Sequence, residues 1–553
     1  MPGETAAHAP PEGGASSGSN PQSDGAPHKV SSGDGKPFKN EGKRRNRSNR
    51  KASHADGRTA PAEDPGVGDT LAWLDLSSPM ALIEEAELRA TEATQEVLRN
   101  GWEDPTRTAP MDALLQAIFQ TRAPNPQYDE VLQGVFARID KLVQNNIKGV
   151  TVAPFGSFAS GIHSCGSDVD MSLQVAPFSP FAFKFSQDQS TQSKSARKRE
   201  EIQYKQSKVK LLRKLANLLR QNGQRDVHLI PHANVPLVKF VDAMTGVHCD
   251  MCVNNDGVFK SQALRHISTI DTRFIGLILL VKCWAKASNI NDPTNGTLNS
   301  FAITLLILFH LQQCSPPIMP PLSEFLSSDP EAARDEVEAE DARVGAGRAP
   351  APPERKKADG LQHLQQCMAS AQAFHATGFS SLNGSSVGAL LATFFARYAA
   401  VAELWPAGLA VRPYAGRFGQ GRQWAEGKYT MLVEDPFCYY ENCARSVHPN
   451  LMGTIQSAFK RAAALLQHPP RDLAHAHETV VALFGAFVPQ PPALQGMLMQ
   501  PRVVHMGPPG PPGLAPGPAL PLVAPAGGIP LPPQQLQQHL MHQQHLQHLM
   551  HQQ

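Results

Sequence analysis

Three aspartates carry the strongest chemical signal in the sequence. Asp168 and Asp170 lie two residues apart in an apolar run, so on a β-strand both carboxylates would leave the same face. Asp250 lies in a second strand-like run that a sheet could place beside the first. Carboxylate oxygens are the ligands that Mg²⁺ prefers, and Mg²⁺ keeps substrate phosphates in its coordination shell. The sequence therefore predicts that Asp168, Asp170 and Asp250 hold Mg²⁺, with Mn²⁺ as an alternative, and perform phosphoryl transfer.

A glycine and a serine precede the first two aspartates. Gly156 would let the backbone approach a triphosphate closely, and Ser157 could donate its hydroxyl and N–H groups to phosphate oxygens. A lone Asp-x-Asp pair is most often a solvated turn. Its combination with a Gly-Ser turn before it and a third aspartate after it instead favours a nucleotide site.

Two lysines share one face of an expected helix. Lys282 and Lys286 are four residues apart, so both ammonium groups would project in the same direction. Their neighbours, such as Val281 and Trp284, are apolar and predict a largely buried helix. Buried ammonium groups need an anionic partner, which favours a bound triphosphate over the alternative of a solvated helix stripe.

Together these motifs resemble the signature of the DNA polymerase β-like nucleotidyltransferases. Longer runs narrow the resemblance to the terminal RNA uridylyl- and adenylyltransferases, over roughly residues 80 to 465. Residues 289–322 are most similar to the plant and algal enzymes that uridylate small RNAs and RNA fragments. The runs that carry the resemblance are Leu280–Lys286, Asn289–Pro293, Gly296–Phe301, Pro316–Leu322 and Glu434–Phe437.

The resemblance implies a role for most of the remaining site residues. Ser300 and Phe301 match a Ser-Tyr pair that holds the nucleotide, and the ring of Phe301 would stack on the base unless it is a plain core residue. Ser261 falls where the family often places a small hydroxyl residue near the nucleotide, although a helix N-cap is an equal alternative. Asp435 matches an acidic residue near the base edge, and the two lysines match phosphate-contacting positions.

The choice between UTP and ATP depends on the residues near the base edge. A carboxylate at Asp435 could accept a hydrogen bond from the N3–H group of uracil or from the amino group of adenine. Some uridylyl-selective relatives carry a histidine where this chain has Glu441, and Cys438 replaces another acidic neighbour. Glu441 could read uracil in place of that histidine, or it could be a solvated residue.

The predicted fold class is α+β. We expect a polymerase β-like palm, a mixed sheet with helices, joined to a mainly helical central, PAP-associated domain between disordered arms. The expected segments are a disordered arm with a basic cluster (1–68), a helical lead-in that is part of the central domain (69–145), the palm (146–262), the central domain (263–465) with a disordered insertion (324–375), and a linker with a Pro-, Gln- and His-rich disordered tail (466–553).

Composition limits the partners and the compartment. The net charge is only +2, so affinity for RNA must come from local basic clusters such as 43–51 and 194–214. The first cluster is equally compatible with nuclear import or a solubilising tail, and the second with a solvated helix face. Eight cysteines in 553 residues and no signal peptide predict a reducing compartment, cytoplasmic or nuclear, without secretion. The apolar runs are too short to span a membrane.

Taken together, the sequence predicts a template-independent RNA 3′-terminal nucleotidyltransferase. We expect it to add uridines from UTP to single-stranded 3′ ends of small RNAs or RNA fragments, to promote their decay, and to recruit protein partners through its arms. The nearest alternative is a poly(A) polymerase that uses ATP. A non-catalytic RNA-binding scaffold is disfavoured because all three aspartates are present, and a small-molecule nucleotidyltransferase because the central domain is long.

Overall fold

The computed structural model describes residues 79–183, 193–326, 360–421, 424, 427–438 and 441–488. All of them belong to one of the two compact units of the chain, Leu71–Gln553. The other unit, Met1–Thr70, lies outside the described residues, and so do the predicted N-terminal arm, the basic cluster at 43–51 and the Pro-, Gln- and His-rich tail.

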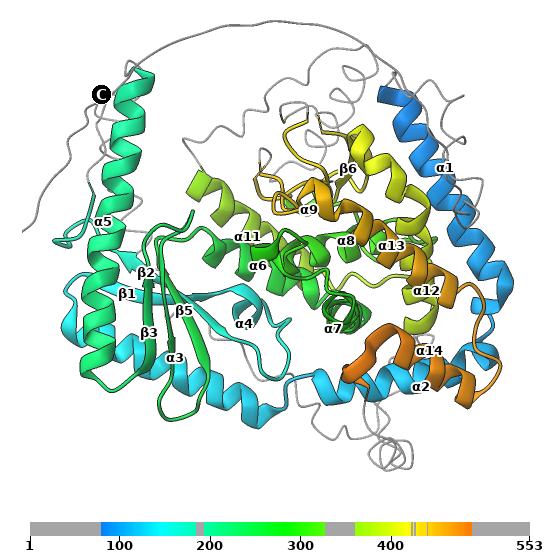
Figure 1. Ribbon diagram of the computed structural model, residues 1–553, viewed down its shortest axis with the longest axis horizontal. Coiled ribbons are helices and arrows are strands. Elements are labelled where there is room, and N and C mark those ends of the chain that lie inside the picture. The colour runs from blue at the N-terminus through cyan, green and yellow to red at the C-terminus, as the bar shows by residue number, and fades with distance from the viewer. Residues whose placement is uncertain are drawn as a thin grey trace, which may run out of the picture. The chain divides into compact units, whose positions relative to one another are not determined.

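A mixed five-stranded sheet forms the palm, as the sequence predicted (Figure 1). Its strand order is β1-β2-β5-β4-β3, and β2 and β5 run parallel while the other neighbours are antiparallel. In the parallel pair Asp170 lies directly opposite Asp250, so the register alone brings two of the predicted carboxylates together on one face. The strands are β1 (Val150–Phe155), β2 (Val169–Val175), β3 (Arg225–Ile230), β4 (Leu237–Val241) and β5 (His248–Val253).

Two long helices, α3 (Pro126–Asn146) and α5 (Lys194–Gln221), cover the other face of the sheet. The side chain of Asn125 caps α3 by accepting a hydrogen bond from the backbone N–H of Tyr128. Apolar residues of both helices share one core with the sheet strands. The prediction that all of residues 69–145 belong to the central domain was therefore wrong for α3, because its apolar face packs on the palm.

The remaining helices build a second, larger core around α8 (Ser300–Gln312). Every residue of α8 from Ala302 to Gln312 is buried, which accounts for its largely apolar composition. A small sheet of order β7-β6-β8 closes one side of this domain. The other elements are α1 (Pro79–Val97), α2 (Pro105–Arg122), α6 (Gly257–Ser268), α7 (Thr272–Ala287), α9 (Ser323–Leu326), α12 (Val387–Val401), α13 (Pro449–Leu465), β6 (Leu409–Arg412), β7 (Arg417–Gln420) and β8 (Leu432–Val433), with the short helix α4 (Gly156–Ser160) in the palm.

Two helices lie where the sequence predicted disorder or a linker. Within the expected insertion 324–375, α11 (Gly360–Ala376) buries Leu364, Cys367 and Ala371 along one face and packs against α6. Within the expected linker, α14 (Leu473–Phe484) packs its own apolar face on α2. Both predictions were wrong in these ranges. Apolar residues spaced among Gln and His form the buried face of each helix, and composition alone does not reveal this spacing.

Among the described residues, one helical run, 387–407, is long and apolar enough to cross a membrane. It consists of α12 and the following 3-10 turn, and 78% of its most apolar window is buried inside the protein. Packing in the central core therefore accounts for its composition.

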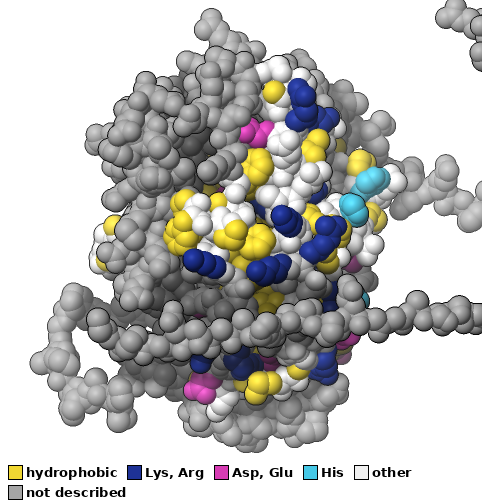
Figure 2. All heavy atoms as spheres, turned by 90° about the vertical axis from the view of Figure 1, so that its left-hand side faces the viewer, with side chains coloured by type: hydrophobic (Ala, Val, Ile, Leu, Met, Phe, Trp, Pro, Cys, Tyr) yellow, Lys and Arg dark blue, Asp and Glu magenta, His cyan; other side chains and the backbone are white. Residues whose placement is uncertain are grey.

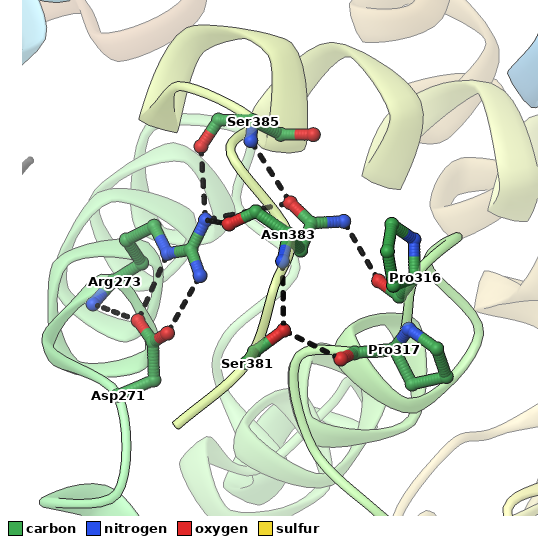
Figure 3. A network of polar contacts seen from close by, with 7 residues as sticks. All are labelled: Asp271, Arg273, Pro316, Pro317, Ser381, Asn383 and Ser385. Carbon is green, nitrogen blue, oxygen red and sulfur yellow. Dashed lines mark hydrogen bonds and ion pairs between the residues drawn. The ribbon is translucent and has the colours of Figure 1, made fainter. Parts of the chain in front are cut away.

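A polar network fixes the start of α7 to the chain on both sides of the insertion (Figure 3). The guanidinium of Arg273 donates to both carboxylate oxygens of Asp271, at 2.9 and 2.6 Å, and to the backbone carbonyl oxygens of Asn383 and Ser385. The amide of Asn383 in turn donates to the carbonyl oxygen of Pro316 at 2.8 Å. Because α7 also carries Lys282 and Lys286, this network holds the helix that presents both lysines.

Candidate active site

A cavity of about 460 Å³ lies between the palm and helices α6, α7 and α8. Its walls come from the turn between β1 and α4, the segment that leads into β2, and one face of each of the three helices. Most of the site residues predicted from the sequence line this cavity, namely Gly156, Ser157, Asp168, Asp170, Ser261, Lys282, Lys286, Ser300 and Phe301. Asp250, Asp435 and Glu441 are not among its lining residues.

Gly156 is the point of closest approach between the turn and the carboxylates. A Cβ atom at this position would lie 2.1 Å from Oδ2 of Asp170, and the backbone φ of 70° also disfavours a side chain. The N–H of Gly156 donates to Oγ of Ser261 at 2.8 Å. Ser261 lies inside α6, which begins at Gly257, so its hydroxyl braces the Gly-Ser turn and is not a helix N-cap.

The carboxylates crowd one another on the cavity side of the sheet. Burial, together with the negative charges of Asp250 and Asp168, raises the pKa of Asp170 to about 7. Burial and the charge of Asp250 also raise the pKa of Asp168. Mutual repulsion of this kind is what a divalent cation between the groups would relieve, so the three aspartates fit the Mg²⁺ or Mn²⁺ that the sequence predicts.

The three aspartates do not form a ready coordination shell. In the described part of the chain, no group of three or more His, Cys, Asp or Glu side chains is already arranged to hold a metal ion. Oδ2 of Asp250 instead accepts a hydrogen bond from Nζ of Lys239 at 2.7 Å. Lys239 lies opposite Asp250 on β4 and is half exposed, so this ion pair can open at little cost.

The cations of α7 face the carboxylates across the cavity. Burial, and next the positive charge of Lys286, lowers the pKa of Lys282 to about 8. Two positive charges close to each other favour an anionic ligand. Both side chains line the cavity and do not form a solvated stripe on the outside of the helix. Arg122, at the C-terminal end of α2, lines the same region and was not predicted from the sequence.

The start of α8 forms another wall of the cavity. Ser300 and Phe301 begin α8, where the Asn299 side chain caps the helix by accepting from the N–H of Ala302 at 2.8 Å. The amide of Asn299 also donates to the carbonyl oxygen of Cys443 at 2.6 Å, which ties this end of α8 to the segment after β8. Phe301 is partly buried against the central core and leaves a surface in the cavity on which a base can stack.

Asp435 is held away from the cavity by a lysine that the sequence reasoning missed. Its Oδ1 accepts the N–H of Phe437 at 3.0 Å, and its Oδ2 accepts from Nζ of Lys260 at 2.6 Å. Burial opposes the charge on Lys260, but Asp435 outweighs it and the pKa of Lys260 is raised. Lys260 lines the cavity. The available signal was a lysine directly before Ser261 and directly after the apolar pair Val258 and Phe259.

Glu441 is placed differently from the sequence prediction. Its side chain is 54% exposed and forms an ion pair with Arg445 at 3.1 Å. Its backbone carbonyl oxygen accepts from the N–H of Asp435. In this structure Glu441 shapes the loop through its backbone, and its carboxylate has the solvated position that was the alternative interpretation.

A second group of cations lies outside the cavity. The N-terminal half of α5 extends beyond the sheet, and Figure 2 shows Lys and Arg side chains gathered on this side of the molecule. Lys198, Arg199 and Lys210 are exposed there, and Lys208 lies over the ring of Tyr204 at 4.4 Å. The basic stretch noted in the sequence is therefore largely a solvated helix face in this structure.

Comparisons with known proteins agree with this geometry. Residues 111–269 match the family model described as "Poly(A) RNA polymerase, mitochondrial-like, central palm domain". Protein HESO1 of Arabidopsis thaliana is 33% identical over 374 residues, which cover 66% of this chain and 63% of that protein. Poly(A) RNA polymerase cid11 of Schizosaccharomyces pombe is 30% identical over 46% of each chain. Human terminal uridylyltransferase 7 is 24% identical over 40% of this chain and 13% of its own length.

A solved structure supports the fold. The crystal structure of mtPAP in complex with UTP superposes with a TM-score of 0.50 at 18% identity, and covers 68% of this chain and 72% of that one. The likeness extends over the palm and helical domains and agrees with the α+β class predicted from the sequence. This chain spans less than two thirds of the length of the curated relatives described above.

Proposed function

Because this chain belongs to the terminal RNA nucleotidyltransferase family, we propose that it adds nucleotides to RNA 3′ ends without a template. The proposed substrates are UTP and single-stranded 3′ ends of small RNAs or RNA fragments, whose decay the added uridines would promote. The arms outside the described residues would recruit partners, and the protein would act in the cytoplasm or the nucleus.

One observation carries the proposal. A single cavity gathers the Gly156-Ser157 turn, two crowded carboxylates and the paired lysines of α7, with Asp250 next to Asp170 on the adjoining strand. Carboxylates on one wall and ammonium groups on another match a polyanion that is bound together with cations. An RNA-binding scaffold would not need this crowding, which raises the pKa of Asp170 and stabilises nothing in the absence of a ligand.

The chain's own residues divide the work. Ser157, Lys282 and Lys286 would bind the triphosphate, while Phe301 would hold the base and so align the α-phosphate for in-line attack. Asp168, Asp170 and Asp250 would hold Mg²⁺ or Mn²⁺, which when bound stabilises the charge on the transferring phosphate and the leaving pyrophosphate. Asp250, once released from Lys239, would accept the proton of the RNA 3′-hydroxyl.

The preference for UTP over ATP rests on similarity. Residues 289–322 resemble enzymes that uridylate RNA, and a relative named terminal uridylyltransferase 7 matches this chain. ATP is the second candidate, because the matching family model and the relative cid11 are both named for poly(A) RNA polymerases.

An extension assay tests the proposal. Purified full-length protein, Mg²⁺ and a labelled single-stranded RNA are incubated with each NTP separately and then with all four in competition. Preferential incorporation of UMP is the expected result. Preferential incorporation of AMP would assign the protein to the poly(A) polymerases instead, and no incorporation from any NTP would favour the RNA-binding scaffold.

A further inference from the structure

The ion pair between Lys260 and Asp435 joins two parts of the chain that are 175 residues apart. Lys260 belongs to α6, which lies beside the palm, and Asp435 follows β8 of the central domain. The pair is well shielded, because the side chains are 18% and 4% exposed. Of the two residues only Lys260 lines the cavity, so the ligand meets an ammonium group here and not the carboxylate.

This ammonium group lies at the end of the cavity where the base would bind. Lys260 and Asp435 lie close enough to Cys443 for their charges to affect the pKa of its thiol, and the carbonyl oxygen of Cys443 accepts from Asn299. Asn299 caps the helix that presents Phe301. Lys282 and Lys286 come from a different wall, the one that faces the carboxylates. The position of Lys260 therefore suits contact with the base rather than with the triphosphate.

Asp435 fixes the direction of this contact. One carboxylate oxygen of Asp435 is bound by the N–H of Phe437 and the other by Lys260. Because Asp435 is also buried, swinging Lys260 away would leave a carboxylate without its partner in an apolar setting. Of the two further N–H donors of the ammonium group, one is directed to the thiol of Cys438, which leaves one for a ligand, and the group offers no acceptor.

We propose that Lys260 is a specificity-determining residue that donates a hydrogen bond to the C4 carbonyl oxygen of uracil and disfavours bases that present an amino group at the same place. This inference rests on the proposed function. Uracil carries carbonyl oxygens at C2 and C4, whereas cytosine and adenine present an amino group at C4 and C6. A donor facing an amino group leaves both groups unpaired, which is costly in a site shielded from water. Asp435 is the positioning residue for this contact.

UTP and CTP provide the sharpest test, because their rings have the same size. At C4 uracil carries a carbonyl oxygen, whereas cytosine carries an amino group. The ratio of kcat/KM for UTP to that for CTP is measured with full-length protein, Mg²⁺ and a single-stranded RNA. Lys260→Met, which keeps the length of the side chain but removes the charge and the donors, should lower this ratio about ten- to hundredfold. Asp435→Asn should lower the ratio less, because the donor remains but is held less firmly.

Lys286→Met is the matched control. We call the end of the cavity with Asp168, Asp170, Lys282 and Lys286 the phosphate end, and the end with Lys260 and Phe301 the base end. Lys286→Met removes an ammonium group from the phosphate end and should reduce kcat/KM for UTP and for CTP alike. The ratio of the two kcat/KM values should not change. Lys260→Gln covers the case in which Lys260→Met does not fold, because the amide still reaches Asp435 as a neutral donor. This variant should keep a measurable but reduced preference for UTP.

The outcomes separate this inference from the function on which it rests. Wild-type protein that incorporates neither UTP nor CTP would count against the proposed function itself. Active wild-type protein whose UTP to CTP ratio is the same in Lys260→Met, or in Lys260→Gln if the first variant is unfolded, would overturn the role of Lys260. A fall in the ratio for the Lys260 variants, together with a constant ratio for Lys286→Met, would support it.

Discussion

The two ends of the cavity are built differently. At the phosphate end, like charges crowd one another, although Asp250 is paired with Lys239, and the pKa values of Asp170 and Lys282 are both moved toward neutrality, to about 7 and about 8. At the base end, the charged groups are already paired, as in the ion pair of Lys260 and Asp435 at 2.6 Å. The first end therefore gains stability only when a charged ligand arrives, whereas the second is organised before any ligand binds.

This difference predicts that catalysis depends on one end of the cavity and discrimination between nucleotides on the other. Crowded carboxylates and lysines would favour any nucleoside triphosphate with its metal ions, because every NTP carries the same phosphates. A preorganised donor beside an aromatic ring would instead distinguish one base from another. Substitutions at the phosphate end should change the rate for all nucleotides. Substitutions at the base end should change which nucleotide is preferred.

The largest expected effect is at Asp250. Asp250→Ala should reduce kcat with every NTP by at least about a hundredfold, because it removes both the proposed proton acceptor and a metal ligand. Its thermal unfolding midpoint should stay close to that of the wild type, since the partner Lys239 is half exposed and can be solvated. Extension kinetics and a thermal melt check both statements, and near-normal turnover in the variant would remove Asp250 from the mechanism.

Gly156→Ala should affect both stability and activity. The new Cβ would meet Oδ2 of Asp170 at 2.1 Å in a backbone with φ of 70°, which should cost about 1 to 3 kcal/mol of unfolding free energy and displace the carboxylate. Gly223→Ala is the matched control, because its φ is 76° and no atom lies within 4 Å of the added Cβ. Urea denaturation and extension rates should separate the two variants, with Gly223→Ala fully active. Equal activity in both would mean that the close approach is unimportant.

The pH dependence of nucleotide affinity should report on Lys282. Its pKa of about 8 in the free protein should rise when a triphosphate binds, because the protonated form makes the contact. Affinity for every NTP should therefore fall, by up to about tenfold per pH unit, as the pH rises above about 8. Titration calorimetry between pH 6.5 and 9.5 measures this fall. Lys282→Met should bind NTPs more weakly, and its affinity should not fall above about pH 8. A fall in the affinity of that variant equal to that of the wild type would assign the titration to another group.

The smallest effect is expected at Glu441. Glu441→Ala should change kcat/KM for UTP by less than about twofold, because the side chain is 54% exposed and its ion pair among the described residues is with the exposed Arg445. Its backbone contact to Asp435 survives the substitution. A large loss of preference for UTP in this variant would show that the loop moves Glu441 to the base and that the base end is not preorganised.

The residues of the phosphate end could be grouped from the sequence because that end is encoded locally. Gly156, Ser157, Asp168 and Asp170 lie within one turn, one short helix and one strand, and helical spacing was enough to place Lys282 beside Lys286. The partner of Asp250 was within reach of the same reasoning. Lys239 is the one polar residue in the strand Leu237–Val241, and such an interruption of an apolar run often marks a residue that faces a site.

The base end could not be predicted in the same way because it is assembled from distant segments. Asp435 was assigned to the base edge by its motif, but only the fold shows that Lys260 occupies its carboxylate. Glu441 was assigned because it stands where some uridylyl-selective relatives carry a histidine, yet its side chain pairs with Arg445. The helices α11 and α14 were missed for a related reason, since residues such as Cys367 and Ala476 become a buried stripe only when their packing partner is known.

The measurement that tests the central claim most directly is pyrophosphate release with single-stranded RNA, Mg²⁺ and UTP by wild-type protein and by the double variant Asp168→Ala plus Asp170→Ala. We expect RNA-dependent release by the wild type and none above background by the variant, which should still melt cooperatively. Equal release by both proteins would contradict the assignment of this cavity as the site of nucleotidyl transfer.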